Sequence, residues 1–158
     1  MRNSGSLVVM LLLACVSNPS PAKAACEQFS GKYVLSAAAC YNVIHGQQFP
    51  DSVYAGINIS AVDSRSSLSM QYQRDAGDNG FTVAYIADGK EHAGDYYNSG
   101  KTYTASCDGT QIKSIRSGIF IAPIEMTFSK ESDGTYTLTE TVTATTPFVR
   151  SCSFVRVP

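Results

Sequence analysis

Polar and apolar residues alternate strictly between residues 67 and 73, and they alternate again between residues 135 and 143. The apolar members of these two runs are Leu68, Met70, Tyr72, Tyr136, Leu138 and Val142. A period of two is typical of β-strands with one buried face, because successive side chains of a strand point to opposite faces. The three alanines within residues 35–42 predict one helical turn or a wide loop. No longer helical pattern follows, so the chain is predicted to be all-β.

The predicted strands are separated by short turns rich in Gly, Asp, Asn and Ser. Asp88-Gly89 and Asp108-Gly109 are typical of tight hairpin turns, in which glycine accepts a positive φ. Pro123 cannot donate to a strand ladder and therefore marks an edge or a bulge. Nine or ten consecutive strands would leave two exposed edges, which closure removes. The sequence thus predicts a single antiparallel up-and-down β-barrel of about 8–10 strands.

Residues 1–24 have the pattern of a secretory signal peptide. Arg2 precedes an apolar run from Leu7 to Leu13, and Ala22-Lys23-Ala24 is a small-x-small cleavage site. The run is too short to span a bilayer, which takes about 20 residues. The mature domain is then residues 25–158, exported to the periplasm or the extracellular space. Alternatively, Leu12-Leu13-Ala14-Cys15 resembles the lipobox of bacterial lipoproteins. Cys15 would then be lipidated and the protein would be an outer-membrane lipoprotein. Contact with a membrane is predicted only in this case.

The composition is that of one globular domain. The chain has 158 residues, of which 12 are Lys or Arg and 13 are Asp or Glu. A nucleic-acid-binding protein needs a basic face, and this balance predicts none.

Four cysteines remain once Cys15 is set aside, and an even number in an exported domain predicts two disulfides. Four cysteines allow three pairings. We favour Cys26–Cys40, which closes a short local loop, and Cys107–Cys152, which joins a middle strand to the last strand. No two cysteines have the close spacing that zinc sites usually show, so no metal site is predicted.

Phe29-Ser30-Gly31-Lys32-Tyr33 resembles the glycine-x-tryptophan signature on the first strand of lipocalins and their calycin relatives. The resemblance implies that Gly31 and Tyr33 close one end of the barrel and that a late arginine, Arg150 or Arg156, stacks on the signature ring. The stretch from Asp88 to His92 and the stretch from Tyr103 to Cys107 are also similar to small bacterial lipocalin-like envelope proteins.

No catalytic constellation is evident, so we expect a non-enzymatic protein without a cofactor. The two histidines, His45 and His92, lie in a loop and beside a turn, and no nucleophile motif accompanies them. Glu140 breaks an otherwise apolar inward row, and a buried carboxylate must be paired or protonated. We expect it to pair with Arg150 or Arg156, or alternatively to contact a ligand.

The leading hypothesis is a carrier or sensor that binds a small apolar or amphipathic ligand inside the barrel. The predicted ligand contacts are Tyr33, Met70, Tyr72, Tyr85, Tyr103, Met126, Phe128, Tyr136 and Glu140. Tyrosines suit a ligand with both apolar and polar parts. The same side chains could instead fill the barrel. The protein would then be a protein-binding module, such as an envelope inhibitor or structural lipoprotein, that presents the predicted loop at residues 37–51 to an envelope protein partner.

Overall fold

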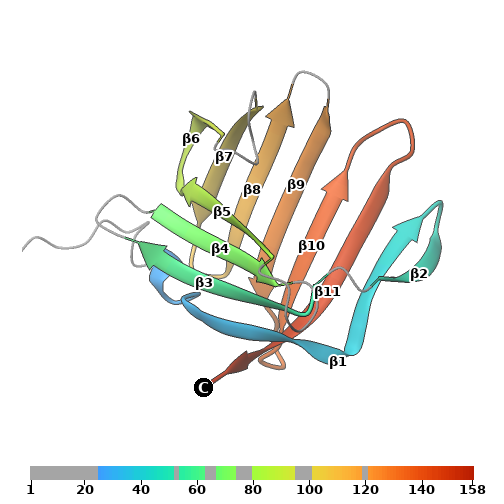
Figure 1. The fold of residues 1–158 in the computed structure, drawn as a ribbon, viewed down its shortest axis with the longest axis horizontal. Helices are drawn as coiled ribbons and strands as arrows, with labels where there is room; N and C mark the ends of the chain where they lie inside the picture. The colour runs from blue at the N-terminus through green and yellow to red at the C-terminus, as the bar shows by residue number, and fades with distance from the viewer. Residues whose placement is uncertain (1–24, 52–53, 63–66, 74–79, 95–100, 119–120) are drawn as a thin grey trace, which may run out of the picture.

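The computed structural model describes residues 25–51, 54–62, 67–73, 80–94, 101–118 and 121–158. Eleven strands follow one helical turn at residues 25–27 (Figure 1). They are β1 (Gly31–Ile44), β2 (Gln47–Asp51), β3 (Gly56–Val62), β4 (Ser67–Gln73), β5 (Phe81–Ile86), β6 (Asp88–Ala93), β7 (Lys101–Cys107), β8 (Gln111–Gly118), β9 (Ile121–Lys130), β10 (Tyr136–Val142) and β11 (Phe148–Val157). The predicted leader, residues 1–24 with Cys15, lies outside the described residues. In the described ranges, no helix is long and apolar enough to cross a membrane.

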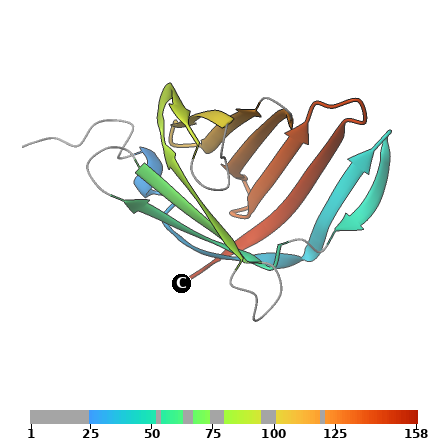
Figure 2. The ribbon, with the colours of Figure 1, turned by 45° about the horizontal axis from the view of Figure 1, so that its top comes forward.

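All eleven strands belong to one antiparallel sheet that curls into a nearly closed barrel. The order is β5-β4-β3-β1-β11-β10-β9-β8-β7-β6, so the first strand pairs with the last. Strands β3 to β5 form one wall and cross the wall formed by β7 to β10 (Figures 1 and 2). The predicted antiparallel barrel is confirmed. Ten strands lie on its path, and β2 is an additional strand that pairs only with β1 in the described ladders.

The strand order ends at β5 and β6, which makes the boundary between them a seam in the wall. The chain passes from β5 to β6 through Ala87 alone, and no ladder joins these two strands in the part of the chain that the structure describes. The predicted hairpin turn at Asp88-Gly89 is therefore wrong. Gly89 does have a positive φ of 76°, but it lies where the β6–β7 register shifts between Asp88 and Glu91. The positive φ of this glycine therefore belongs to a β-bulge, and the chain does not reverse direction here.

Strand β1 replaces the turn or loop predicted over residues 35–42. Leu35 lies opposite Phe154 and Cys40 lies opposite Cys152, so five steps along β1 match two along β11. This bulge lets β1 bend. Beyond it, residues 40–44 of β1 stay paired with β11 and also pair with β2, so a β-hairpin beside β11 (Figure 2) replaces the predicted loop at residues 37–51. His45 and Gly46 make its two-residue turn, with φ of 50° and 78°.

A second predicted irregularity is present in β9. Arg116 lies opposite Ile124 and Gly118 lies opposite Ile121, so one more residue is present on β9 than on β8 at this point. Pro123 lies in the segment of β9 that contains the extra residue. A bulge suits proline, because proline has no backbone N–H to donate to the ladder. The Pro123 carbonyl accepts a hydrogen bond from Thr143 N at 3.2 Å.

The two disulfides are Cys26–Cys107 and Cys40–Cys152, so the favoured pairing of Cys26 with Cys40 and Cys107 with Cys152 is wrong. The reason lies in strand register. Cys40 and Cys152 are directly opposed on β1 and β11, with Cα atoms 4.0 Å apart. Cys26 lies in the helical turn and reaches the end of β7. The bridges span 81 and 112 residues. Loops of this length restrict the unfolded chain and stabilise the fold by about 4–5 kcal/mol each.

Candidate functional site

Glu140 brings a carboxylate into the interior of the barrel. On β10 the buried residues alternate as Tyr136, Leu138 and Glu140, and the Glu140 residue is only 5% exposed. Its register partners are Met126 on β9 and Arg150 on β11. Because paired residues of an antiparallel ladder point to the same face, Arg150 also faces inward at this level.

One oxygen of this carboxylate is firmly held. Glu140 Oε2 accepts a hydrogen bond of 2.8 Å from Arg150 Nη1 and one of 3.0 Å from the Tyr54 hydroxyl. The Arg150 guanidinium in turn lies over two rings, 5.5 Å from the centre of Tyr54 and 5.8 Å from that of Phe148. These contacts fix the position of Arg150.

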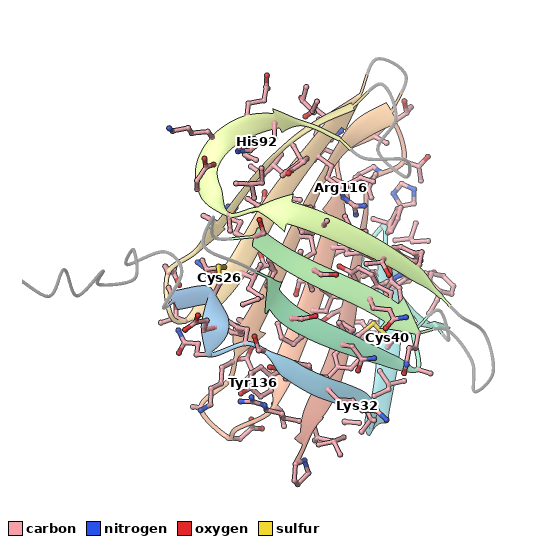
Figure 3. All side chains as sticks on the ribbon, turned by 60° about the vertical axis from the view of Figure 1, so that its left-hand side comes forward. Cys26, Lys32, Cys40, His92, Arg116 and Tyr136 are labelled. Atoms are coloured by element: carbon pink, nitrogen blue, oxygen red, sulfur yellow. A yellow bond between two sulfur atoms is a disulfide. The ribbon has the colours of Figure 1, made fainter. Side chains whose placement is uncertain are left out.

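The other oxygen is held loosely, and its partner is Arg116 on β8. Arg116 Nη2 lies 3.5 Å from Glu140 Oε1, the long limit of a hydrogen bond. Arg116 Nε is buried without a hydrogen-bond partner among the described residues. Figure 3 shows Arg116 towards the end of the barrel that carries His92, with Tyr136 towards the opposite end.

An arginine side chain keeps its charge in proteins, and the pKa of Arg116 is raised further. Burial lowers the pKa of its guanidinium, but the charges that Tyr85, Tyr72 and Glu140 can carry outweigh this effect, and the net shift is upward. Burial raises the pKa of Tyr72 well above its ordinary value. Burial also raises the pKa of Tyr54, and the adjacent Glu140 charge adds to it. Both tyrosines are therefore neutral donors near neutral pH, and the charges at this level belong to the arginines and the glutamate.

Two further polar side chains lie at the same level of the barrel. Asn42, Arg150, Glu140, Met126 and Ser114 are successive register partners across β1, β11, β10, β9 and β8. Ser114 is 0% exposed, and within the described part of the chain its Oγ has no hydrogen-bond partner; nor does Asn42 Oδ1.

We call these side chains the polar belt: Asn42, Tyr54, Ser114, Arg116, Glu140 and Arg150. Buried polar atoms are normally paired, so unpartnered atoms gathered in one belt indicate a place where another polar group binds.

Three of the predicted ligand residues belong instead to the packed end of the barrel. Tyr33, Phe128 and Tyr136 form a triangle of rings with centres 4.8–5.6 Å apart. Phe29, from the segment after the helical turn, packs on Phe128 at 6.2 Å. The Tyr33 hydroxyl donates a hydrogen bond of 2.7 Å to Phe29 O. These rings fill the space that they line.

The remaining predicted ligand residues lie closer to the polar belt. Met126 is the register neighbour of both Glu140 and Ser114. Tyr72 lies beside Tyr54, with ring centres 5.2 Å apart, and its hydroxyl contacts Met70 Sδ at 3.8 Å. Tyr103 lies opposite Arg116 on β7, and its ring is 5.3 Å from that of Tyr85.

The residues that the lipocalin resemblance assigns to barrel closure fall into two groups. Arg156 lies over Gly31, where a side chain would not fit: a Cβ on Gly31 would be 2.7 Å from Arg156 Nε. The same guanidinium donates to the carbonyl of Ser30, and Arg156 is the register partner of the buried Tyr33. Gly31, Tyr33 and Arg156 thus meet at the packed end. Arg150 is elsewhere, in the polar belt.

The histidines lie outside this site. His45 is in the β1–β2 turn, and His92 Nε2 lies 2.8 Å from the exposed Asp88 carboxylate. The hydrogen bond from His92 lowers the pKa of Asp88. Among the described residues, no three His, Cys, Asp or Glu side chains gather as metal ligands would.

Sequence reasoning identified Glu140 and Arg150 but missed Arg116, Tyr54, Ser114 and Asn42. The inward-facing residues of β8 include Ile112, Ser114 and Arg116. Two of these three are polar, so the alternation of polar and apolar residues does not show which face of this strand is buried. The register of Arg116 with Tyr103 and Ile124 is what reveals its direction. Tyr54 lies between strands, where no alternation applies.

No family model and no curated protein matches the chain. A solved structure does: a crystal structure of a mutant of the fluorescent protein UnaG superposes with a TM-score of 0.54. The match covers 83% of this chain and 97% of that chain at 12% sequence identity. An identity this low carries information on the fold alone. Together with the nearly closed antiparallel barrel, it identifies a calycin-type fold.

Proposed function

We propose that this chain is a non-enzymatic binding protein that holds a small amphipathic ligand with an acidic group inside its barrel. The observation that carries the proposal is the state of Arg116. Its guanidinium is charged and mostly buried, one long contact to Glu140 holds it, and its Nε has no partner among the described residues. A buried cation is costly unless an anion pairs with it, and a planar guanidinium favours carboxylate-like and phosphate-like groups.

The apolar part of the ligand would lie against the side chains that flank the polar belt. Met126, Tyr72 and Tyr85 are buried at this level and come from both walls of the barrel. Tyr33, Phe128 and Tyr136 are less suitable, because they already pack on one another. The ligand would therefore occupy the half of the barrel beyond the aromatic rings.

We place this activity outside the cytoplasm, in a lipocalin-like protein of a bacterial cell envelope. Two disulfides support an oxidising compartment, since such bridges are rare where thiols are kept reduced. The signal-like residues 1–24 support export to the periplasm or the extracellular space. Lipidation at Cys15 is the alternative, with an outer-membrane location.

The proposal is tested with an apolar anion, anilinonaphthalene sulfonate, whose fluorescence rises on transfer out of water. We expect it to bind the wild-type protein, and we expect Arg116→Gln to weaken binding roughly 10- to 100-fold, the range expected for one lost charge-assisted hydrogen bond. The matched control is Lys113→Gln. Lys113 is on the same strand but on the outer face, where its Nζ pairs with Glu125 at 2.5 Å.

An equal loss of affinity in both variants would contradict the assignment of Arg116, because it would indicate only a general attraction of the dye to positive charge. Absence of dye binding to the wild-type protein would contradict the ligand-binding function itself. Near-ultraviolet circular dichroism of each variant checks that the aromatic packing is retained.

A protein-binding module is a second candidate, favoured by the hairpin of β1 and β2. Tyr41 and Phe49 are large side chains of this hairpin and are 37% and 45% exposed. In this reading the hairpin, rather than the barrel interior, contacts an envelope protein. The dye experiment separates the two candidates, because a surface function does not depend on Arg116.

A further inference from the structure

The two oxygens of Glu140 have different surroundings. Oε2 accepts bonds from Arg150 and Tyr54 at 2.8 and 3.0 Å, whereas the contact that the described residues give Oε1 is Arg116 at 3.5 Å. Glu140 therefore faces the loosely held guanidinium with its less engaged oxygen. Arg116 is the residue to which we assign the acidic group of the ligand, so this oxygen is part of the same site.

An acidic group bound to Arg116 would lie close to the Glu140 carboxylate. A charge-assisted hydrogen bond to a guanidinium measures about 2.7–2.9 Å, and the same guanidinium is 3.5 Å from Glu140 Oε1. Two anionic oxygens would thus share one cation at close range. In a buried site with little water to screen them, each additional negative charge on the ligand raises the repulsion.

We propose that Glu140 determines the charge of the ligand: it admits a singly charged acidic group at Arg116 and disfavours a doubly charged one. The inference rests on the proposed function and goes beyond it, because it assigns selectivity to a residue that binds no ligand atom. The carboxylate in contact with Arg116 is that of Glu140, so the repulsion that a bound anion meets there comes from Glu140.

Two probes with the same apolar body test this selectivity. Naphthyl sulfate carries one negative charge, and naphthyl phosphate carries close to two at pH 8, since the second pKa of a phosphate ester is about 6. The dissociation constant of each is measured by calorimetry for wild type and Glu140→Gln. The matched control is Glu125→Gln, which removes a carboxylate on the neighbouring strand from the outer face, where it pairs with Lys113.

We expect the wild-type protein and the Glu125→Gln variant to prefer the sulfate by about tenfold, which corresponds to 1.4 kcal/mol. Glu140→Gln should reduce that preference to roughly twofold or reverse it, because the repelling charge is gone. A wild-type protein without a preference, or a preference that Glu140→Gln leaves unchanged, would overturn the inference. Failure of both probes to bind the wild-type protein would instead contradict the proposed function.

A second measurement needs no variant and applies if Glu140→Gln does not fold. At pH 5 naphthyl phosphate carries about one charge, like the sulfate. The preference of the wild-type protein should then nearly disappear, while the sulfate reports any change in the protein between the two pH values. The same preference at pH 5 and pH 8 would overturn the inference.

Discussion

Arg116 and Arg150 contact the same carboxylate, but their environments give them different roles. Arg150 has a 2.8 Å bond to Glu140 and lies over the rings of Tyr54 and Phe148. Arg116 has a 3.5 Å contact and an unpartnered buried Nε within the described residues. We interpret Arg150 as the residue that fixes Glu140 in place, and Arg116 as the residue left to bind an external anion.

At the residue scale, the tyrosines of the interior predict a loss of stability at alkaline pH. Burial raises the pKa of Tyr33 to about 12, from an ordinary value of 10.0. The folded state thus holds this proton more tightly than the unfolded state does. The resulting stability is fully present below pH 10 and is lost as the pH rises from 10 to about 12.

We therefore expect the denaturant midpoint of unfolding to fall between pH 8 and pH 11, and to fall less in Tyr33→Phe than in the wild-type protein. Urea titrations at the two pH values, followed by circular dichroism, measure both midpoints. An identical fall in both proteins would contradict this role for Tyr33.

Single residues were predictable from the sequence where they disturbed a clear pattern. Glu140 interrupts the apolar row of β10, and this identified it. Arg116 follows Ser114 on β8, where the inward face is itself polar and sequence alone cannot separate inside from outside. Only pairing with neighbouring strands shows which way such a residue points.

At the element scale, strands with period two were predictable and irregular ones were not. The interior residues of β4 and β10 alternate in burial as their sequences predict. The three alanines in β1 predict a helical turn or loop, whereas the structure has a bulged strand there, and a bulge needs no sequence signal of its own. The hairpin at His45-Gly46 does not follow from the sequence, because His-Gly is not among the dipeptides that are typical of two-residue hairpin turns.

The disulfide pairing was missed for a related reason. Nearness in sequence favoured Cys26–Cys40, whereas the bulge in β1 decides that Cys40 faces Cys152. Register depends on contacts between strands that are far apart in the chain.

At the seam between β5 and β6, we expect the local stability to depend on one side chain, that of Tyr103. Ile86 is the last residue of β5, and its N–H donates to the Tyr103 hydroxyl at 3.0 Å. Tyr103 also packs against His92 on β6, with ring centres 5.6 Å apart. This side chain thus connects β5 and β6 where the backbone ladder does not.

Tyr103→Phe should therefore increase the hydrogen exchange rate of the Ile86 amide and lower the free energy of unfolding by about 0.5–1.5 kcal/mol, the net contribution of a typical hydrogen bond, because this amide is only partly buried. Exchange is measured residue by residue by NMR. Tyr41→Phe, which removes an exposed hydroxyl from the β1–β2 hairpin, is the control and should leave the Ile86 amide unchanged. Unaltered Ile86 exchange in Tyr103→Phe would show that this hydrogen bond does not hold the seam.

At the scale of the whole molecule, the barrel has an aromatic end and a polar belt. The aromatic end is filled by Phe29, Tyr33, Phe128 and Tyr136, with Arg156 over Gly31. The Cys26–Cys107 bridge ties the helical turn to the end of β7 there, and the Cys40–Cys152 bridge joins β1 to β11 next to the belt. A rigid, packed end leaves the belt as the part of the interior suited to a ligand.

The measurement that tests the central claim most directly is native mass spectrometry of the wild-type protein, purified without denaturation, alongside Arg116→Gln. We predict a small-molecule mass on the wild-type protein that disappears on denaturation and is much reduced in Arg116→Gln. After denaturation the chain should weigh four hydrogens less than its reduced form, from the two disulfides. An unliganded mass for the wild-type protein, or an equal amount of ligand on both proteins, would contradict the claim that Arg116 binds an acidic ligand inside this barrel.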